Sequence, residues 1–294
     1  MKQLMIWRHE DKSDMAKFMA EVFERISNET DRLSSRDVTA ITFWNARGLP
    51  EPQVLLSLKE GTIIHISETW RTTGKTNLPS SLDSYNKVWS PAIKNKILGR
   101  PSGGLVTLID KDLNYRILSS SHHWLATLVT INDVKIIMVS LYLSPSSSIS
   151  TVLNDFKLTL DDLLLSTDFD LFIIGGDFNA RLGLLNTVPL EAADGSHITL
   201  KRNSMDTKVT QRGIALNNFM EEHRFVLLNG RCHPDTSGKF TFFGAQGLSV
   251  VDLVWVNTAS IDLITEFSVD QSAYRSDHYP IVVKVATKAH KPHM

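Results

Sequence analysis

The chain of 294 residues is long enough to bury a large core, either in one layered domain or in two smaller ones. Its net charge of −1 argues against a protein that coats nucleic acid, although it allows an enzyme that touches DNA locally and binds cations in an acidic cleft. The only cysteine, Cys232, excludes a disulfide framework. We expect neither secretion nor a membrane association, because the amino terminus lacks the apolar core of a signal peptide and no apolar run reaches roughly 18 residues.

The first predicted element is an amphipathic helix. Apolar residues recur at helical spacing in residues 13–26, with charged residues on the opposite side. Such a helix packs on the main domain or on a protein partner. The polar stretch at residues 27–37 is typical of a linker. We therefore expect a helical extension at residues 1–37, a main domain at residues 38–287 and a short tail at residues 288–294.

Strands and helices alternate through the main domain. The first half predicts a short helix at residues 53–59 and strands at residues 38–44, 62–67, 105–109, 124–131 and 134–143. A helix is predicted at residues 149–166, before the buried strand at residues 170–180. After that strand comes a long irregular stretch at residues 182–206, which is a candidate for a functional loop. The last part predicts a helix at residues 211–222 and strands at residues 225–228, 240–243, 249–256 and 280–285.

The stretch of residues 170–180 predicts a strand that is buried on both faces. Its unbroken apolar run leads directly into two glycines and then into Asp177 and Asn179. Residues two apart in a strand point to the same side, so the carboxylate and the amide would face the same space beyond the sheet edge. The alternative is that both residues only form a turn and cap the next segment.

Other strands also end in polar side chains. Asn45, Glu68 and Tyr142 each follow or end a predicted strand, and each taken alone has an ordinary turn or packing explanation. Asp252 lies within an apolar strand, where a carboxylate is unfavourable unless it is paired. His278, at the entry to the last strand, is its natural partner.

Together these residues match the chemistry of phosphodiester hydrolysis. That reaction uses hard oxygen ligands for Mg²⁺, an acid and an amide that position water, and a histidine backed by an aspartate beside the phosphate. The set comprises Asn45, Glu68, Tyr142, Asp177, Asn179, Asp252, Asp277 and His278.

The sequence resembles the endonuclease/exonuclease/phosphatase superfamily, and within it the apurinic-endonuclease-like domains of non-LTR retrotransposons. Six segments carry this resemblance in the family's order: residues 44–49 (WNARGL), 67–70 (SETW), 140–142 (SLY), 175–180 (GGDFNA), 249–253 (SVVDL) and 276–280 (SDHYP). The Gly-Asp-Phe-Asn segment alone is moderately specific. All six segments in this order make a chance match an unattractive explanation.

The resemblance implies an α/β fold, a four-layer α/β/β/α sandwich of two mixed sheets with helices on both outer faces. It implies that Glu68 and Asn45 hold Mg²⁺, with Mn²⁺ as an alternative, and that Asp277 assists them. It further implies that Asp177 handles the attacking water and that Asn179 holds that aspartate and the phosphate. His278, supported by Asp252, would stabilise the transition state, and Tyr142 would donate a hydrogen bond to the phosphate.

Some positions depart from the family pattern or add to it. Arg47 stands where repair-type relatives often have an acid, which weakens the interpretation as an abasic-site repair enzyme. The turn after Tyr142 also differs from that of many relatives. Arg181, Asn229 and Thr241 match positions that often touch the DNA backbone, and we expect the same contacts here.

The predicted function is a Mg²⁺-dependent DNA endonuclease that leaves a 3′-hydroxyl and a 5′-phosphate, as in target-primed retrotransposition. The alternatives are an abasic-site repair nuclease or phosphoesterase on the same fold, and a catalytically silent DNA- or protein-binding descendant. The intact set of polar residues argues against the silent descendant. The resemblance also implies DNA as partner and a nuclear location, and it leaves open whether the chain is an excised domain or a stand-alone protein.

Overall fold

The computed structural model describes residues 38–58, 61–94, 99–188, 196–245, 247–272 and 276–287. The chain divides into two compact units, residues 1–38 and 39–294, and nearly all described residues belong to the second. The predicted helix at residues 13–26, the linker and the tail lie outside the described residues, so the domain boundaries remain predictions. Among the described helices, none is both long and apolar enough to cross a membrane.

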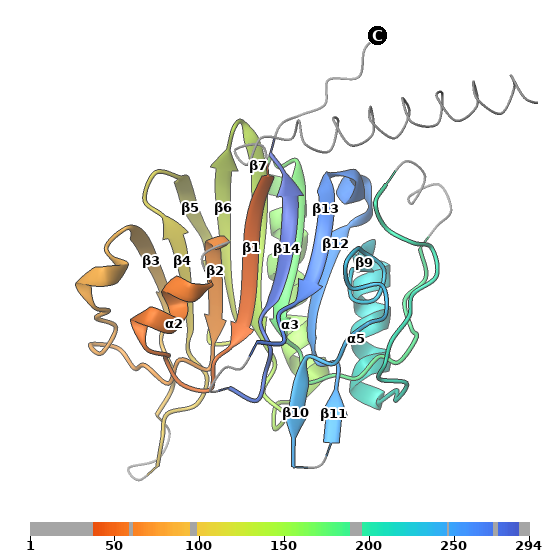
Figure 1. The fold of residues 1–294 in the computed structure, drawn as a ribbon, viewed down its shortest axis with the longest axis horizontal. Coiled ribbons are helices and arrows are strands. Elements are labelled where there is room, and N and C mark those ends of the chain that lie inside the picture. The colour runs from red at the N-terminus through yellow and green to blue at the C-terminus, as the bar shows by residue number, and fades with distance from the viewer. Residues whose placement is uncertain are drawn as a thin grey trace, which may run out of the picture. The chain divides into compact units, whose positions relative to one another are not determined.

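Two mixed sheets of six strands each form the centre of the second unit (Figure 1). In the first sheet the spatial order is β13 (Ile264–Val269), β14 (Ile281–Ala286), β1 (Val38–Asn45), β2 (Gly61–Ser67), β4 (Leu105–Asp110) and β3 (Tyr85–Ser90). In the second it is β5 (Asn114–Ser120), β6 (Trp124–Ile131), β7 (Val134–Tyr142), β8 (Leu171–Asp177), β12 (Asp252–Asn257) and β9 (Phe225–Leu227). Within these sheets β1 pairs with β2, and β7 with β8, in parallel.

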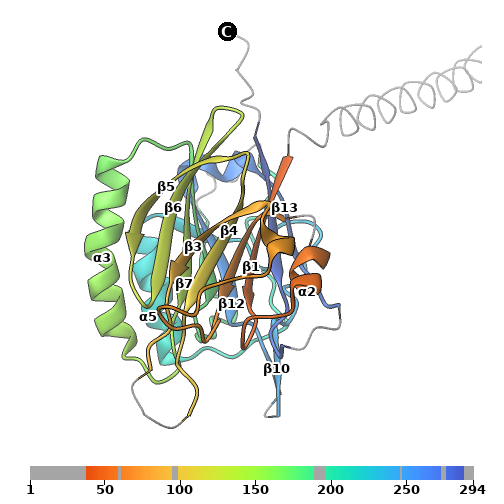
Figure 2. The same ribbon diagram turned by 90° about the vertical axis from the view of Figure 1, so that its left-hand side faces the viewer.

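Helices cover both outer faces of the paired sheets (Figure 2). The apolar sides of α3 (Ile149–Ser166) and α5 (Gln211–Glu222) pack on the second sheet. The short α2 (Pro52–Ser57) and the 3₁₀ turn η1 (Ser80–Leu82) contribute Leu55 and Leu82 to the cluster on the first sheet. A second 3₁₀ segment, η2 (Thr258–Leu263), follows β12. The expected four-layer α/β/β/α sandwich is thus confirmed.

Alternation of side chains explains why the central strands are apolar throughout. On β8, Leu171 and Ile173 face the space between the sheets, whereas Phe172 and Ile174 face the helices. Because both faces are covered, no polar position interrupts the run. Gly175 continues the inter-sheet face, and a methyl group there would lie 2.6 Å from the Phe43 ring. The glycine is therefore required by the close approach of β1 to β8.

Most predicted elements are confirmed, and α3 and α5 have the expected bounds. One interpretation was wrong: Asp252 is the first residue of β12 and does not lie inside a strand that begins at residue 249. Residues 247–249 instead form a separate strand, β11 (Gly247–Ser249). This strand pairs with β10 (Phe242–Gly244) in a small ribbon that projects at the lower edge in Figure 1. The chain joins the second sheet after this ribbon, at the start of β12. Strands β3, β5 and β13 were not predicted.

Candidate active site

The predicted site residues extend the inter-sheet faces of their strands. Asn45 follows Ile41 and Phe43 on β1, and Asp177 follows Ile173 and Gly175 on β8, each at steps of two. Asp177 is opposite Tyr142 of β7 and Asp252 of β12 in the sheet register. Since β7 and β8 end where antiparallel β12 begins, these polar groups meet at one end of the space between the sheets.

Asp177 lies at the centre of this group and is 1% exposed. Its Oδ2 accepts hydrogen bonds from Asn45 Nδ2 and Asn179 Nδ2, both at 2.8 Å. Its Oδ1 accepts from the backbone N–H of Asn179 at 2.9 Å, and Asn179 has a left-handed φ of 46°. Asn179 also donates to the Leu143 carbonyl at 3.1 Å. Three donors, one from β1 and two from the loop after β8, thus fix the orientation of a buried carboxylate.

Asp252 and His278 form a buried pair beside Asp177. His278 Nδ1 lies 3.0 Å and 2.9 Å from the two oxygens of Asp252, and its Nε2 lies 3.9 Å from Asp177 Oδ2. The main chain of His278 is held as well, because Trp44 Nε1 donates to its carbonyl at 3.0 Å. Asp252 therefore backs one ring nitrogen and leaves the other directed at Asp177.

Glu68 and Tyr142 meet at the edge of the same space. The Tyr142 hydroxyl donates a hydrogen bond to Glu68 Oε1. Glu68 has a left-handed φ of 53°, and its carbonyl accepts from the Gly48 N–H at 2.8 Å. This strained turn directly after β2 places the Glu68 side chain beside Tyr142, the last residue of β7.

Asp277 is held on one side only. Its Oδ2 forms an ion pair with Arg47 Nη1, while its Oδ1 is buried and has no hydrogen-bond partner among the described residues. A buried carboxylate oxygen without a partner is unfavourable unless a cation or water satisfies it. Glu68 and Asn45 carry oxygen donors of the same hard type, which divalent ions such as Mg²⁺ prefer. The residues present thus fit a divalent ion.

The charges of the site depend on burial and on close neighbours. Burial raises the pKa of Asp177 to about 7, an effect opposed by His278 and reinforced by Asp252. Burial alone would lower the pKa of His278, but Asp252 and then Asp177 raise it to about 9. Burial, with the Glu68 hydrogen bond, also raises the pKa of Tyr142. At neutral pH the site therefore presents a cationic histidine, a neutral tyrosine and an aspartate that can exchange a proton.

A second donor group lies deeper in the site. Ligand atoms of Asp177, Asp252 and His278, all buried, lie within 4.8 Å of one another, which is close enough to hold a metal ion. Both oxygens of Asp252 already lie at hydrogen-bond distance from His278 Nδ1. That contact favours a hydrogen-bonded chain over a second metal centre.

The three residues expected to touch DNA do not present free side chains. Asn229 and Thr241 are fully buried. Asn229 donates to the Asp252 carbonyl at 3.0 Å, and Thr241 Oγ1 accepts from the Asp252 N–H at 3.0 Å. Arg181 is partly exposed, and two of its nitrogens bind Asp206 at 2.8 Å and 2.6 Å. The first two residues hold the main chain of Asp252 from both sides.

Sequence reasoning missed two supporting residues. Arg212 on α5 donates to the carbonyls of Asn179 and Ser147 at 3.1 Å and 2.7 Å, which ties the two loops beside Asp177 together. Ser276 donates to the Asn45 carbonyl at 2.7 Å and accepts from the His278 N–H at 3.1 Å. Ser276 lies in a segment that carries the resemblance, whereas nothing in the sequence distinguishes Arg212 from other helix arginines.

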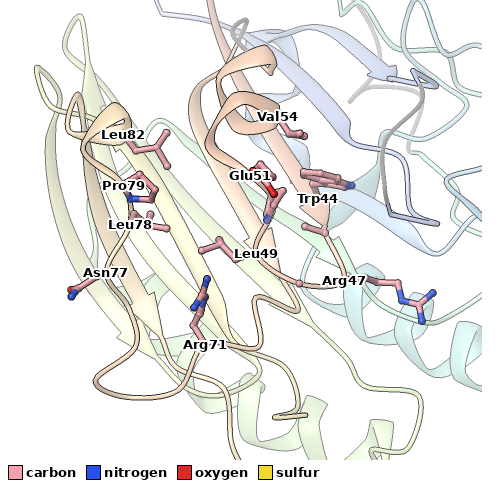
Figure 3. A pocket seen from close by; sticks show the side chains of 13 residues that line it. Trp44, Arg47, Leu49, Glu51, Val54, Arg71, Asn77, Leu78, Pro79 and Leu82 are labelled. Carbon is pink, nitrogen blue, oxygen red and sulfur yellow. The ribbon is translucent and has the colours of Figure 1, made fainter. Parts of the chain in front are cut away.

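A pocket of ≈ 390 Å³ adjoins the site on the side of the first sheet (Figure 3). Trp44 and Arg47 connect it to the site, and its other lining residues include the apolar Leu49, Leu78 and Leu82 as well as the polar Glu51, Arg71 and Asn77. In Figure 3 the Arg47 guanidinium points away from the pocket. Arg47 is therefore directed at Asp277 and not into the pocket.

Several solved structures share the fold of this chain. The endonuclease domain of TRAS1, a telomere-specific non-LTR retrotransposon, matches with a TM-score of 0.60 at 18% identity, over 85% of this chain and 100% of its own. The AP endonuclease LMAP from Leishmania major matches at 0.63 and 15%, over 86% and 89%. The 3′-5′ exonuclease NExo from Neisseria meningitidis matches at 0.56 and 16%, over 84% and 99%. At such identities these likenesses show the fold.

The fold, with polar strand ends gathered at one edge of two stacked sheets, is that of the endonuclease/exonuclease/phosphatase superfamily, as the resemblance implied. The chain belongs to the endonuclease-reverse transcriptase family, whose sequence model matches residues 136–282. No curated protein sequence matches the chain. The family confirms a nuclease fold.

Proposed function

We propose that the protein is a Mg²⁺-dependent DNA endonuclease that nicks one strand and leaves a 3′-hydroxyl and a 5′-phosphate, as in target-primed retrotransposition. One observation carries the proposal. Asp177, oriented by Asn45 and Asn179, faces a histidine that Asp252 backs. This pairing sets a proton acceptor beside a cation at the edge where Glu68 and Asp277 offer oxygen ligands.

Asp177 acts as the general base. Burial raises its pKa to about 7, so the carboxylate can accept a proton near neutral pH. A water deprotonated by Asp177 attacks phosphorus, the bond from phosphorus to O3′ breaks, and the departing O3′ takes up a proton. The phosphate then stays on the 5′ end of the downstream strand. Protonated His278 stabilises the negative charge that develops on the phosphate oxygens, and Tyr142 donates a hydrogen bond to one of them.

Glu68, Asn45 and Asp277 are the residues that would hold Mg²⁺. When bound, the ion would neutralise charge on a phosphate oxygen as a Lewis acid. The unpartnered Oδ1 of Asp277 supports this assignment. Mn²⁺ has the same preference for oxygen ligands and would substitute for Mg²⁺.

DNA is the proposed partner, in the nucleus. We keep Arg181 as a contact for the DNA backbone, since its side chain is partly exposed. Asn229 and Thr241 are proposed to act through Asp252, because both hold its main chain. The amino-terminal segment, residues 1–37, remains a proposed docking element for a protein partner.

Plasmid nicking tests this function. Wild type is incubated with supercoiled plasmid and with an abasic duplex, each with Mg²⁺ or EDTA, beside Asp177→Asn and the control Asp168→Asn, whose side chain is 86% exposed. We expect Mg²⁺-dependent nicks that a DNA polymerase extends directly, and a loss of about 10²- to 10⁴-fold in Asp177→Asn alone.

Three results would contradict the proposal: no metal-dependent cleavage, nicking by Asp177→Asn at the wild-type rate, or ends that a polymerase cannot extend. Cleavage restricted to the abasic duplex would establish the second candidate, a repair nuclease. The likeness to the Leishmania AP endonuclease keeps that candidate in the test.

A further inference from the structure

We infer that Arg47 is a built-in cation that positions Asp277 and restricts the site to a single divalent ion. The inference rests on the proposed metal-dependent function and adds a residue that this function does not require. It assigns Arg47 as a positioning residue for the metal ligands.

Arg47 and Asp277 are in direct contact, although they lie 230 positions apart in the sequence. Arg47 Nη1 pairs with Oδ2 of Asp277, and the two side chains are 45% and 18% exposed. The other oxygen, Oδ1, lies 4.0 Å from His278 Nε2 and has no hydrogen-bond partner in the described part of the chain. The arginine thus occupies one oxygen and leaves the other free on the side of the catalytic histidine.

The turn at Arg47 and Gly48 contacts all three proposed metal ligands. Its backbone N–H donates to Asn45 Oδ1 at 3.1 Å, and its guanidinium binds Asp277. The next residue, Gly48, donates from its N–H to the Glu68 carbonyl at 2.8 Å. Arg47 has a left-handed φ of 46°, which is uncommon for a long side chain and directs the guanidinium across the strand ends.

The charges of the side chains at this edge also favour a single divalent ion. Among the described residues at this edge, Asp252 is matched by His278, and Asp277 by Arg47. The hydrogen bonds of Glu68 and Asp177 come from neutral groups, Tyr142 for the first and Asn45 and Asn179 for the second. Asp177 also lies 3.9 Å from His278 Nε2 and interacts with Arg212. Among the described residues Glu68 is therefore the carboxylate at this edge without a paired cation, and one divalent ion would supply that charge, whereas a second ion would compete with Arg47 for Asp277.

Ion binding by the DNA-free protein tests the inference without relying on activity. Bound Mn²⁺ is counted from the loss of the EPR signal of free hydrated Mn²⁺ during a titration. The variants are Arg47→Asn, since asparagine tolerates a left-handed φ, Arg47→Lys, which keeps the charge, and Arg116→Asn, which removes an exposed arginine from the edge strand β5. Thermal melting shows that each variant is folded.

Wild type, Arg47→Lys and Arg116→Asn are expected to bind one ion. Arg47→Asn is expected to bind Mn²⁺ about tenfold more tightly and to admit a second ion, because a nearby positive charge is lost and Asp277 is released. Two ions in wild type, or unchanged binding in Arg47→Asn, would overturn the inference. An Arg47→Asn variant that binds Mn²⁺ like wild type but binds DNA more weakly would also overturn the inference, because Arg47 would then be a phosphate contact.

The plasmid assay separates the two ideas. Metal-dependent nicking by wild type, combined with ion binding that is insensitive to Arg47, overturns this inference alone. A wild type that neither binds Mn²⁺ nor nicks DNA overturns the proposed function together with the inference.

Discussion

At the residue scale, a few buried polar side chains account for the chemistry. Asp177, Asp252 and His278 are almost fully buried, yet each has partners within hydrogen-bond distance. Burying charged groups is unfavourable unless they are paired, so the pairing explains how the fold tolerates them. It also prepares the site, because the partners fix orientation before substrate arrives.

Asp252→Asn tests the pairing of His278. Asp252 is the largest contribution that raises the pKa of His278, which keeps the ring protonated up to about pH 9. Without that carboxylate the pKa of His278 falls, so the protonated form is lost at a lower pH. We expect the basic limb of the pH profile of kcat/KM to move down by about one unit or more. An Asp252→Asn profile that overlays wild type would show that His278 does not act as the cation.

At the element scale, alternation along the strands places the site. The same period of two that buries Ile173 between the sheets brings Asp177 to the end of that space. The sequence therefore predicted the polar strand ends from local pattern alone. It could not predict edge strands such as β5, whose residues are mostly exposed and lack an apolar alternation. The start of β12 was misplaced because the preceding apolar residues pair elsewhere, in β11.

A histidine inside β2 gives a prediction about stability. His65 is buried, stacks on Phe43 and contacts Thr107 Oγ1 at 2.9 Å, and burial lowers its pKa to about 3. The unfolded chain binds a proton there below its ordinary pKa of 6.5, whereas the folded protein does not, so the residue destabilises the fold as pH falls from 6.5 towards 3.

We expect His65→Gln to gain about 2 kcal/mol relative to wild type between pH 7 and pH 5, measured by urea unfolding at each pH. Comparing the two proteins cancels the titration of all other groups. A difference in unfolding free energy that does not change with pH would mean that His65 titrates alike in the folded and unfolded states.

At the scale of the whole molecule, the site depends on contacts between distant parts of the chain. Asn45 meets Asp177 across 132 positions, and Arg47 meets Asp277 across 230. The order of the motifs pointed to the superfamily and so to this convergence. The Arg47–Asp277 ion pair and the hydrogen bonds of Arg212 could not be predicted from the sequence. No local pattern shows which distant group an arginine will contact in the fold.

The central claim is that Glu68, Asn45 and Asp277 together hold one divalent ion. The most direct measurement is anomalous diffraction from crystals of the protein grown with Mn²⁺, recorded at the manganese absorption edge. The account predicts one strong peak per chain, at bonding distance from Glu68 and beside Asn45 and the unpartnered oxygen of Asp277. A peak bonded instead to Asp252 and His278, or crystals without a peak from protein that nicks DNA, would contradict it.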